Sequence, residues 1–139
     1  MALNTQLSNN TVNAGADAEA VLFNSGFIDI YDGVQPATAD TALIAQVKLA
    51  RLTFSASAFP SAVNGVLTAN AITAGTGLAN GTAAWFRVLK SDGVTTILDG
   101  TVGTTASFNL QLPTTTISSG LSISCLSYVH SVAKSASGL

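Results

Sequence analysis

The sequence predicts a mainly β protein, an antiparallel β-sandwich or barrel-like sheet with one N-terminal α-helix. Short segments rich in aromatic and β-branched residues recur between clusters of Gly, Asn, Asp and Pro, the pattern of strands joined by turns. Only one stretch has the spacing of an amphipathic helix. The 139 residues suit one domain. We expect a single β-rich domain over 1–139, with the helix at about 8–24, the β-domain at about 27–130 and a short tail at 131–139.

The clearest element is a β-hairpin within Gly81–Thr104. Its first half, Ala83–Leu89, is rich in aromatic and branched residues. Lys90–Gly93 supplies an Asp-Gly turn in which positive φ is tolerated, and Val94–Val102 resumes the strand pattern. The rest of the chain is expected to be organised around this hairpin.

The hairpin contains the only Trp of the chain, Trp85, followed directly by Phe86. Neighbouring side chains of a strand point to opposite faces of the sheet. We therefore expect one of these rings to fill the core and the other to lie at a lateral face near a partner.

The helix is predicted over Ser8–Asn24. Ser8, Asn9 or Asn10 can cap its start, and Gly15 weakens its middle. Apolar residues recur at about one-turn spacing on one side: Val12, Ala16, Ala20 and Phe23. Asn24, Ser25 and Gly26 then form a stop signal, with Gly26 expected in the left-handed conformation.

The chain from residue 27 onward is expected to alternate strands with turns. Strands are predicted at Phe27–Tyr31, over about eight residues ending at Phe54, and at Val66–Ile72, Phe108–Leu112 and Leu121–Cys125. Loops or turns are predicted at Asp32–Asp40, Phe59–Pro60, Asn64–Gly65 and Ala74–Gly81. The alternation slips at Leu126, which predicts a β-bulge or a change of edge there.

Charged residues make up only 9% of the chain, against about 25% in an ordinary soluble domain. The surface must therefore consist mostly of Ser, Thr, Asn, Gly and Ala. Such a surface loses little hydration when another protein covers it. This composition favours a protein packed against neighbours over a freely soluble monomer that happens to be poor in charge.

The charge balance disfavours direct nucleic-acid binding, because five Lys and Arg stand against seven Asp and Glu, a net charge of −2. The N-terminal residues lack the basic start and apolar run of a signal peptide, and no 18-residue apolar stretch occurs. We expect synthesis in the cytoplasm and no membrane partner.

Metal chemistry has few candidates in the sequence. One cysteine and one histidine, Cys125 and His130, cannot make a zinc site alone, and Cys125 is expected to act as a small hydrophobe in the core. Asp29 and Asp32 could suggest a calcium pair, but no Asp-rich loop of the required spacing accompanies them. We expect no metal ion.

Catalytic motifs are equally absent from the sequence. Asp92 and Asp99 could form a carboxylate pair, but both fit turn positions at the ends of one strand. The glycines before the hairpin are not followed by a helix or a Lys-Ser/Thr pair, so they do not make a phosphate cradle. We expect no catalytic or cofactor-binding residues, no cofactor and no enzymatic activity.

Three runs, Ile28–Asp40, Leu49–Ser55 and above all Gly81–Thr104, resemble small proteins encoded among the virion structural genes of tailed bacteriophages. The chain is most similar in kind to a head decoration, or cement, protein. The resemblance covers most of the chain, including the helix, and rests on patterns of packing and turns.

The resemblance implies a β-rich capsid decoration protein on the virion surface. It would bind the major capsid protein and copies of itself as a homo-oligomer, without nucleic acid, membrane or cofactor. The alternatives are a head-tail connector or tail structural subunit, or a carbohydrate-binding module, which needs aromatic platforms that one Trp and two Tyr supply poorly. Loop residues flanking the sheet are the expected protein contacts: Val34, Gln35, Pro36, Ala37, Thr38, Thr76, Gly77 and Leu78.

Overall fold

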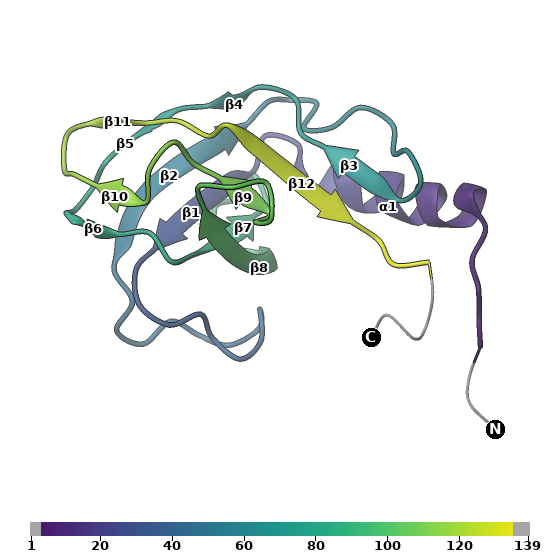
Figure 1. The fold of residues 1–139 in the computed structure, drawn as a ribbon, viewed down its shortest axis with the longest axis horizontal. Coiled ribbons are helices and arrows are strands. Elements are labelled where there is room, and N and C mark those ends of the chain that lie inside the picture. Colours follow the sequence, from purple (N-terminus) through teal and green to yellow (C-terminus); the bar gives the residue numbers. More distant parts are fainter. Residues whose placement is uncertain (1–3, 135–139) are drawn as a thin grey trace.

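The computed structural model describes residues 4–134, in which one helix precedes a curled β-sheet (Figure 1). The helix α1 spans Asn9–Phe23. The strands are β1 (Phe27–Tyr31), β2 (Lys48–Phe54), β3 (Val66–Thr68), β4 (Ile72–Thr73), β5 (Gly75–Thr76), β6 (Gly81–Thr82), β7 (Trp85–Leu89), β8 (Thr96–Gly103), β9 (Leu110–Gln111), β10 (Thr116–Ile117), β11 (Ser122–Ile123) and β12 (Ser127–Ser131).

Eight strands form the main sheet, in the order β3-β12-β9-β8-β7-β1-β2-β4. Neighbours are antiparallel except for β8 and β9, which are parallel. Its two outermost strands, β3 and β4, are separated in sequence by only Ala69–Ala71, so the chain can join them only if the sheet curls into a half-barrel. The predicted mainly β class with one N-terminal helix is confirmed, in the barrel-like form.

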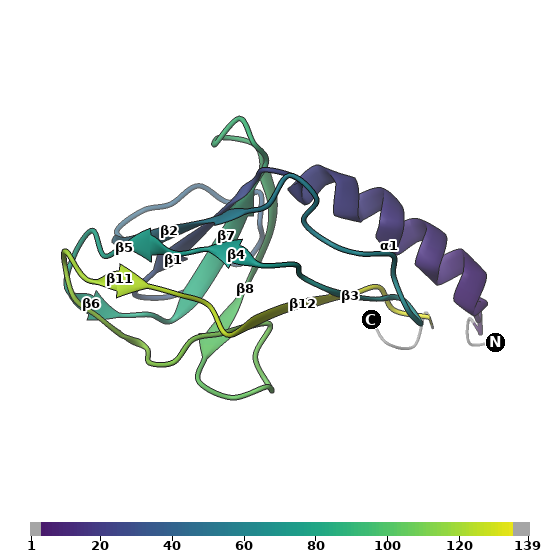
Figure 2. The ribbon, with the colours of Figure 1, turned by 90° about the horizontal axis from the view of Figure 1, so that it is seen from above.

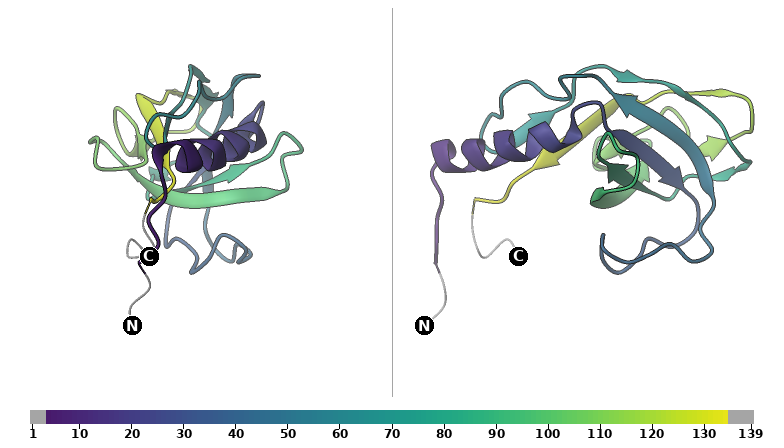
Figure 3. Two further views of the ribbon diagram at one scale, coloured as in Figure 1. Left: turned by 90° about the vertical axis from the view of Figure 1, so that its right-hand side faces the viewer. Right: turned by 180° about the vertical axis from the view of Figure 1, so that it is seen from behind.

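Two small ladders extend the sheet at the end far from α1, where β6 pairs with β10 and β5 pairs with β11 (Figures 1 and 3). The described parts of the two chain ends meet at the opposite end, where the Leu7 N–H donates to the Lys134 carbonyl over 2.9 Å. Figure 2 shows α1 extending away from the sheet at that end.

The helix forms within one residue of its predicted bounds. Ser8 is its N-cap, and its hydroxyl accepts the Thr11 N–H over 3.2 Å. The predicted stop differs in detail, because Ser25 and not Gly26 has the left-handed φ of 55°. Gly26 is needed for space, since a Cβ there would lie 2.5 Å from the Leu89 carbonyl oxygen.

Polar side chains fasten α1 to the segment 58–65, which precedes β3. Asn13, Asp17 and Asn24 each accept a backbone N–H of that segment, at 2.7, 2.7 and 2.9 Å. The helix therefore accepts hydrogen bonds from backbone N–H groups of a segment that forms few strand–strand hydrogen bonds of its own. The predicted Asn64–Gly65 turn lies in this segment and has positive φ at both residues, 53° and 77°.

The core lies between α1 and the inner face of the curled sheet. Five rings pack edge-on or tilted around one another with centroids 5.1–6.2 Å apart: Phe23, Phe54, Phe59, Phe86 and Tyr128. They come from the helix, from three strands and from the loop before β3. Aliphatic residues of β1, β2 and β7 complete the cluster.

The outer face of the sheet holds a second, smaller packed layer. Trp85 stacks on Tyr31 at 4.7 Å between ring centroids, and its indole N–H donates to the Asp32 carbonyl over 3.0 Å. Phe86 fills the core, as expected for one ring of the pair. Trp85 is also fully buried, and its indole N–H bonds to the chain between β1 and β2, so it does not lie at an open lateral face.

Four predicted segments differ from the structure because pairing partners change along them. Val66–Ile72 is two strands, since β3 pairs with β12 and β4 pairs with β2. Ala74–Gly81, predicted as a loop, contains β5 and the start of β6, while the two strands predicted at Phe108–Leu112 and Leu121–Cys125 are two-residue strands, β9 and β11. The slip at Leu126 marks an edge change, from β5 as partner to β9 and β3.

Replacing Phe86 by Ala should lower the free energy of unfolding by about 3 to 5 kcal/mol, because a fully buried ring leaves a cavity that the core cannot fill. Chemical denaturation measures the change. Val94→Ala, at a side chain 79% exposed, is the control and should stay within about 0.5 kcal/mol of wild type. An unchanged midpoint for Phe86→Ala would contradict the assigned core.

Replacing Gly15 by Ala should raise the free energy of unfolding by about 0.5 to 1 kcal/mol. Gly15 lies inside α1, and a Cβ there would meet no atom within 4 Å, so only the helix preference of Ala over Gly acts. In contrast, Gly75→Ala should destabilise, because its Cβ would lie 1.9 Å from the Arg51 carbonyl oxygen. Thermal melts of both variants that moved in the reverse directions would refute this packing.

Candidate protein-contact surface

The longest connection in the sheet, residues 32–47 between β1 and β2, carries the most exposed apolar side chains of the described chain. We call it the β1–β2 loop. Ile44 is 91% exposed and Val34 80% exposed, and Leu43 and Val47 add to them. Val34 and Ile44 line one shallow hollow of about 230 Å³ together with Gly33, Ala45 and Gln46. This grouping of exposed apolar side chains makes the β1–β2 loop a candidate contact surface.

Hydrogen bonds hold the β1–β2 loop in one conformation. The Gln46 side chain donates to the Val34 carbonyl over 2.8 Å and accepts the Ile44 N–H over 2.9 Å. The Asp32 carboxylate accepts the Val47 N–H over 2.7 Å, which closes the base of the loop. The loop thus presents Val34 and Ile44 without a large cost of ordering on binding.

Two ion-pair groups lie on the outer face of the sheet, and the first of them contacts the β1–β2 loop. Arg87 forms a two-pronged pair with Asp99 at 2.7 and 2.9 Å, and the same guanidinium donates to the Thr41 carbonyl of the loop over 2.9 Å. The hydrogen bond to Asp99 raises the pKa of Arg87 above its ordinary value, so the guanidinium stays charged. This pair ties the loop to β7 and β8.

The second group surrounds Asp29, whose side chain is 1% exposed. Arg51 reaches its two oxygens at 2.6 and 2.8 Å, and Lys48 lies at 3.0 Å. Asp32, the other member of the considered calcium pair, accepts a backbone N–H instead. Asp29 and Asp32 therefore do not converge on a common cation.

The second predicted contact segment, 76–78, lies at the tip formed by β5, β6, β10 and β11. Its backbone is bonded to the neighbouring turn, because the Gly77 N–H donates to the Leu121 carbonyl over 2.7 Å and the Gly77 carbonyl accepts the Gly120 N–H over 2.8 Å. Leu78 and Leu121 are 58% and 60% exposed. This tip is a second, smaller apolar surface.

The eight predicted contact residues therefore fall in two places. Exposed among them are Val34, Ala37, Thr38, Thr76 and Leu78; half-buried are Gln35 and Pro36; buried is Gly77. Gly77 has a packing role, because a Cβ there would lie 2.1 Å from the Ser118 carbonyl oxygen.

Sequence reasoning missed Ile44 and Leu121 as surface residues. The apolar run Leu43–Ala45 was a signal for the first of them, since it precedes β2 and has no polar alternation. Its position outside the strand is what exposes it. Nothing local distinguishes Leu121 from a strand residue.

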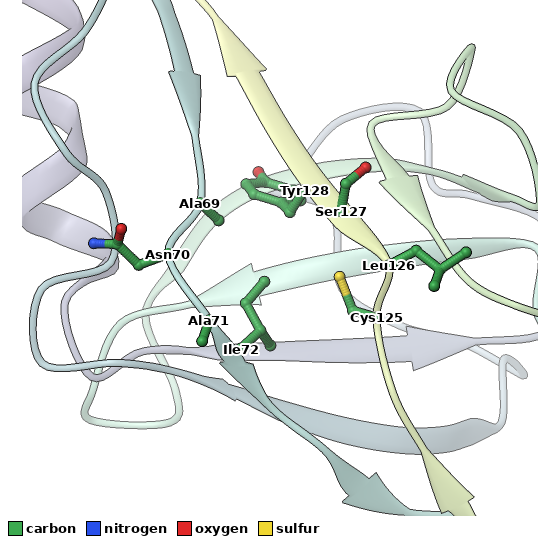
Figure 4. Close-up of a pocket in the computed structure, with 8 residues that line it drawn as sticks. All are labelled: Ala69, Asn70, Ala71, Ile72, Cys125, Leu126, Ser127 and Tyr128. Atoms are coloured by element: carbon green, nitrogen blue, oxygen red, sulfur yellow. The ribbon is translucent and has the colours of Figure 1, made fainter.

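Cys125 borders a small pocket of about 130 Å³ at a split between two neighbouring chain segments (Figure 4). Along the segment 66–76, β3 pairs with β12 and β5 pairs with β11. The strand between them, β4, pairs with β2 instead, and this leaves a gap beside Cys125. Burial raises the pKa of the Cys125 thiol to about 11. The thiol is protonated at neutral pH and therefore a weak nucleophile.

His130 contacts the helix. Its Nε2 lies 2.6 Å from a Glu19 carboxylate oxygen, and its ring lies 5.7 Å from the Phe23 ring. The residue thus joins β12 to α1. Over residues 4–134, no group of three or more His, Cys, Asp or Glu side chains is placed to hold a metal ion.

No helix in the described part of the chain is long and apolar enough to cross a membrane. Comparison with known proteins finds no matching family model, curated protein or solved structure. The structure defines a class of fold: a mainly β protein with one helix, a curled mixed sheet and an apolar loop over its outer face.

Asp92 and Asp99, considered above as a carboxylate pair, have separate partners. Asp99 is held by Arg87, whereas Asp92 lies in the β7–β8 turn and accepts the N–H groups of Val94 and Thr95 at 2.8 Å. Hydrogen bonds from the Thr95 hydroxyl and these N–H groups lower the pKa of Asp92 from 3.8 to about 2.

Because its folded pKa is lowered, Asp92 contributes stability that is present above pH 3.8 and is lost as pH falls to about 2. We expect Asp92→Asn to flatten the fall in stability within this acid range. Carboxyl NMR titration should give Asp92 a pKa well below that of a free Asp. A midpoint near 3.8 would show that the turn does not hold the carboxylate.

Proposed function

We propose that this chain is a structural protein of a tailed-bacteriophage virion, a decoration or cement protein that binds the assembled head and stabilises it. The observation that carries the proposal is the pair of exposed apolar side chains, Val34 and Ile44, on a molecule with few charged residues. The runs Ile28–Asp40, Leu49–Ser55 and Gly81–Thr104 supplied the expectation that the assembly is a phage head. The partners would be the major capsid protein and further copies of the chain. The chain would act by binding, without catalysis, cofactor or nucleic acid.

The composition supports this role. With 9% charged residues, most of the surface is made of hydroxyl, amide and methyl groups that lose little hydration on contact with protein. Interfaces are depleted of charge at their centres. A surface of this kind suits a subunit that is covered on several sides in an assembly.

The β1–β2 loop is the contact that we propose for the head. It offers Val34 and Ile44 on a loop whose conformation is held by Gln46 and Asp32. Hydrophobic burial of two such side chains contributes about 1.5 to 3 kcal/mol each. The tip at Leu78 and Leu121 would be available for a second contact, as bridging of neighbouring capsid subunits requires.

Weak binding per site is sufficient for this function. A ligand that binds only the assembled shell stabilises it by mass action. A micromolar site supplies about 8 kcal/mol at the standard state, and a head repeats the site many times.

Heads prepared without the chain should therefore lose integrity at lower temperature than complete heads, and re-adding the chain should restore them. Equal heat resistance of both would contradict the cement role and leave the connector role.

The loop contact is tested by the double variant Val34→Asp and Ile44→Asp. Because two carboxylates would replace apolar contacts, we expect affinity for heads to fall at least about 100-fold, which corresponds to about 2.7 kcal/mol. Sedimentation of heads with added protein measures it.

The matched control is Val63→Asp, at a side chain 67% exposed in the turn before β3. It should bind heads like wild type. Equal binding by the control and the double variant would place the contact elsewhere on the molecule. If wild type, the control and the double variant all fail to bind heads, the result would argue against the proposed function itself.

A further inference from the structure

The Arg51 side chain, on the outer face of β2, has hydrogen-bond donors that no acceptor uses. A guanidinium carries its five N–H groups in a fixed plane, which gives it one fork at Nε and Nη2 and a second at Nη1 and Nη2. The first fork of Arg51 binds the Asp29 carboxylate at 2.6 and 2.8 Å. The second, which we call the open fork, has no hydrogen-bond acceptor among residues 4–134.

Arg87 offers a comparison within the same sheet. It binds Asp99 through the same fork, at 2.7 and 2.9 Å, but its Nη2 also donates to the Thr41 carbonyl over 2.9 Å. The side chain of Arg87 is 8% exposed, against 34% for Arg51. The β1–β2 loop therefore engages the second fork of Arg87 and leaves that of Arg51 open.

The open fork is held in one orientation. The Arg51 guanidinium lies over the Phe27 ring, 4.6 Å from its centroid, and the two bonds to Asp29 fix its plane. Its Nη1 faces Gly93 of the β7–β8 turn, where a Cβ would lie 3.6 Å away, so no side chain of that residue covers it. A guanidinium already ordered in this way loses little freedom when an acceptor binds.

Positive charge exceeds negative charge beside the open fork. Lys48 Nζ lies 3.0 Å from the same Asp29 oxygen that accepts Arg51 Nη2, so two cations share one carboxylate. Both cations are partly exposed, whereas the Asp29 side chain is buried. Asp92, the acidic residue of the β7–β8 turn, accepts hydrogen bonds from its own turn instead. One positive charge is therefore left in excess.

The distribution of charge over the chain agrees with this local excess. The outer face and the β7–β8 turn hold four of the five basic residues and three of the seven acidic ones: Lys48, Arg51, Arg87 and Lys90 against Asp29, Asp92 and Asp99. Elsewhere Lys134 stands against four acidic residues. This part of the surface is therefore the positive side of an acidic protein, and it attracts negative groups on a partner.

We propose that the open fork of Arg51, together with Lys48, binds a carboxylate, the side chain of an Asp or Glu presented by a protein partner. A carboxylate accepts two parallel hydrogen bonds from such a fork and cancels one charge. Arg is enriched at protein interfaces. The inference goes beyond the proposed function and does not depend on it.

Other anionic ligands fit this setting less well. Arg51 and Lys48 are partly exposed side chains on a sheet face, whereas a small organic ligand needs a cleft that encloses most of its surface. Phosphate sites commonly add the N-terminus of a helix, and the N-terminus of α1 lies at the chain ends, where Lys134 bonds Asn9. A carboxylate on a protein surface needs neither feature.

NMR titration with two capped peptides, acetyl-Ala-Glu-Ala-amide and its Gln counterpart, tests the site at constant ionic strength. The peptides differ only in the carboxylate. We expect the Glu peptide to shift the Arg51 Nε–H signal saturably at concentrations up to about 100 mM, and the Gln peptide to shift it at least about tenfold less. An absent or unsaturated shift with the Glu peptide, or an equal shift with the Gln peptide, would overturn the proposal.

Inorganic phosphate is the third probe. We expect it to bind more weakly than the Glu peptide at the same signal. Tighter binding of phosphate would reassign the site to phosphate and so contradict the carboxylate partner.

Lys48→Gln removes the excess charge and leaves Asp29 paired with Arg51, so the fold does not lose a buried partner. We expect it to weaken binding of the Glu peptide about threefold or more. Lys134→Gln removes the same charge at the chain ends and is the matched control, which should bind like wild type. Equal binding by wild type and Lys48→Gln, or equal weakening in both variants, would contradict the site.

Arg51→Lys separates the fork from the charge, because it retains the cation but not the planar pair of donors. We expect binding of the Glu peptide, followed at the Gly93 amide, to weaken about threefold or more. A folded Arg51→Lys variant that binds like wild type would show that charge alone attracts the peptide and would refute the fork. If this variant does not fold, Lys48→Gln and the Gln peptide decide.

Discussion

Strand β7 has no solvent-facing side, and the rest of the structure follows from that constraint. All five of its residues are buried. Phe86 and Val88 belong to the core under α1, so Trp85 and Arg87 need a second cover on the outer face. The β1–β2 loop supplies it by accepting the Trp85 indole N–H at Asp32 and the Arg87 guanidinium at Thr41. A buried Arg requires such partners, because an unpaired charge there would cost several kcal/mol, roughly 3 to 5.

This arrangement connects the packing of the sheet with the proposed contact surface. The β1–β2 loop contacts Trp85 and Arg87 through hydrogen bonds to its backbone carbonyls. The same loop exposes the apolar side chains of Val34 and Ile44 to solvent. A loop fastened from beneath can present apolar side chains to a partner without first becoming ordered. The same Arg87 also pairs with Asp99 of β8. One buried ion pair thus joins the β1–β2 loop to two strands of the sheet.

Local sequence signals account for the elements that were predicted correctly. Ser8 and the one-turn spacing of Val12 and Ala16 identify the helix, and the Asp-Gly turn identifies the hairpin. The split of residues 66–73 was not predictable, because it depends on β12 and β2, which are distant in sequence. The burial of Trp85 by the β1–β2 loop was not predicted either, because it also depends on contacts between residues distant in sequence. Exposure of Val34 was expected from its loop, but that of Ile44 depends on which side of the loop faces the sheet.

The central functional claim is that many copies of the chain cover a virion head. Its most direct test is the number of copies in purified virions of the phage that encodes it, measured by quantitative mass spectrometry against the major capsid protein. The account predicts a copy number that scales with the capsid lattice, in the hundreds. Roughly six or twelve copies, as a closed ring at the neck would hold, or none at all, would contradict it.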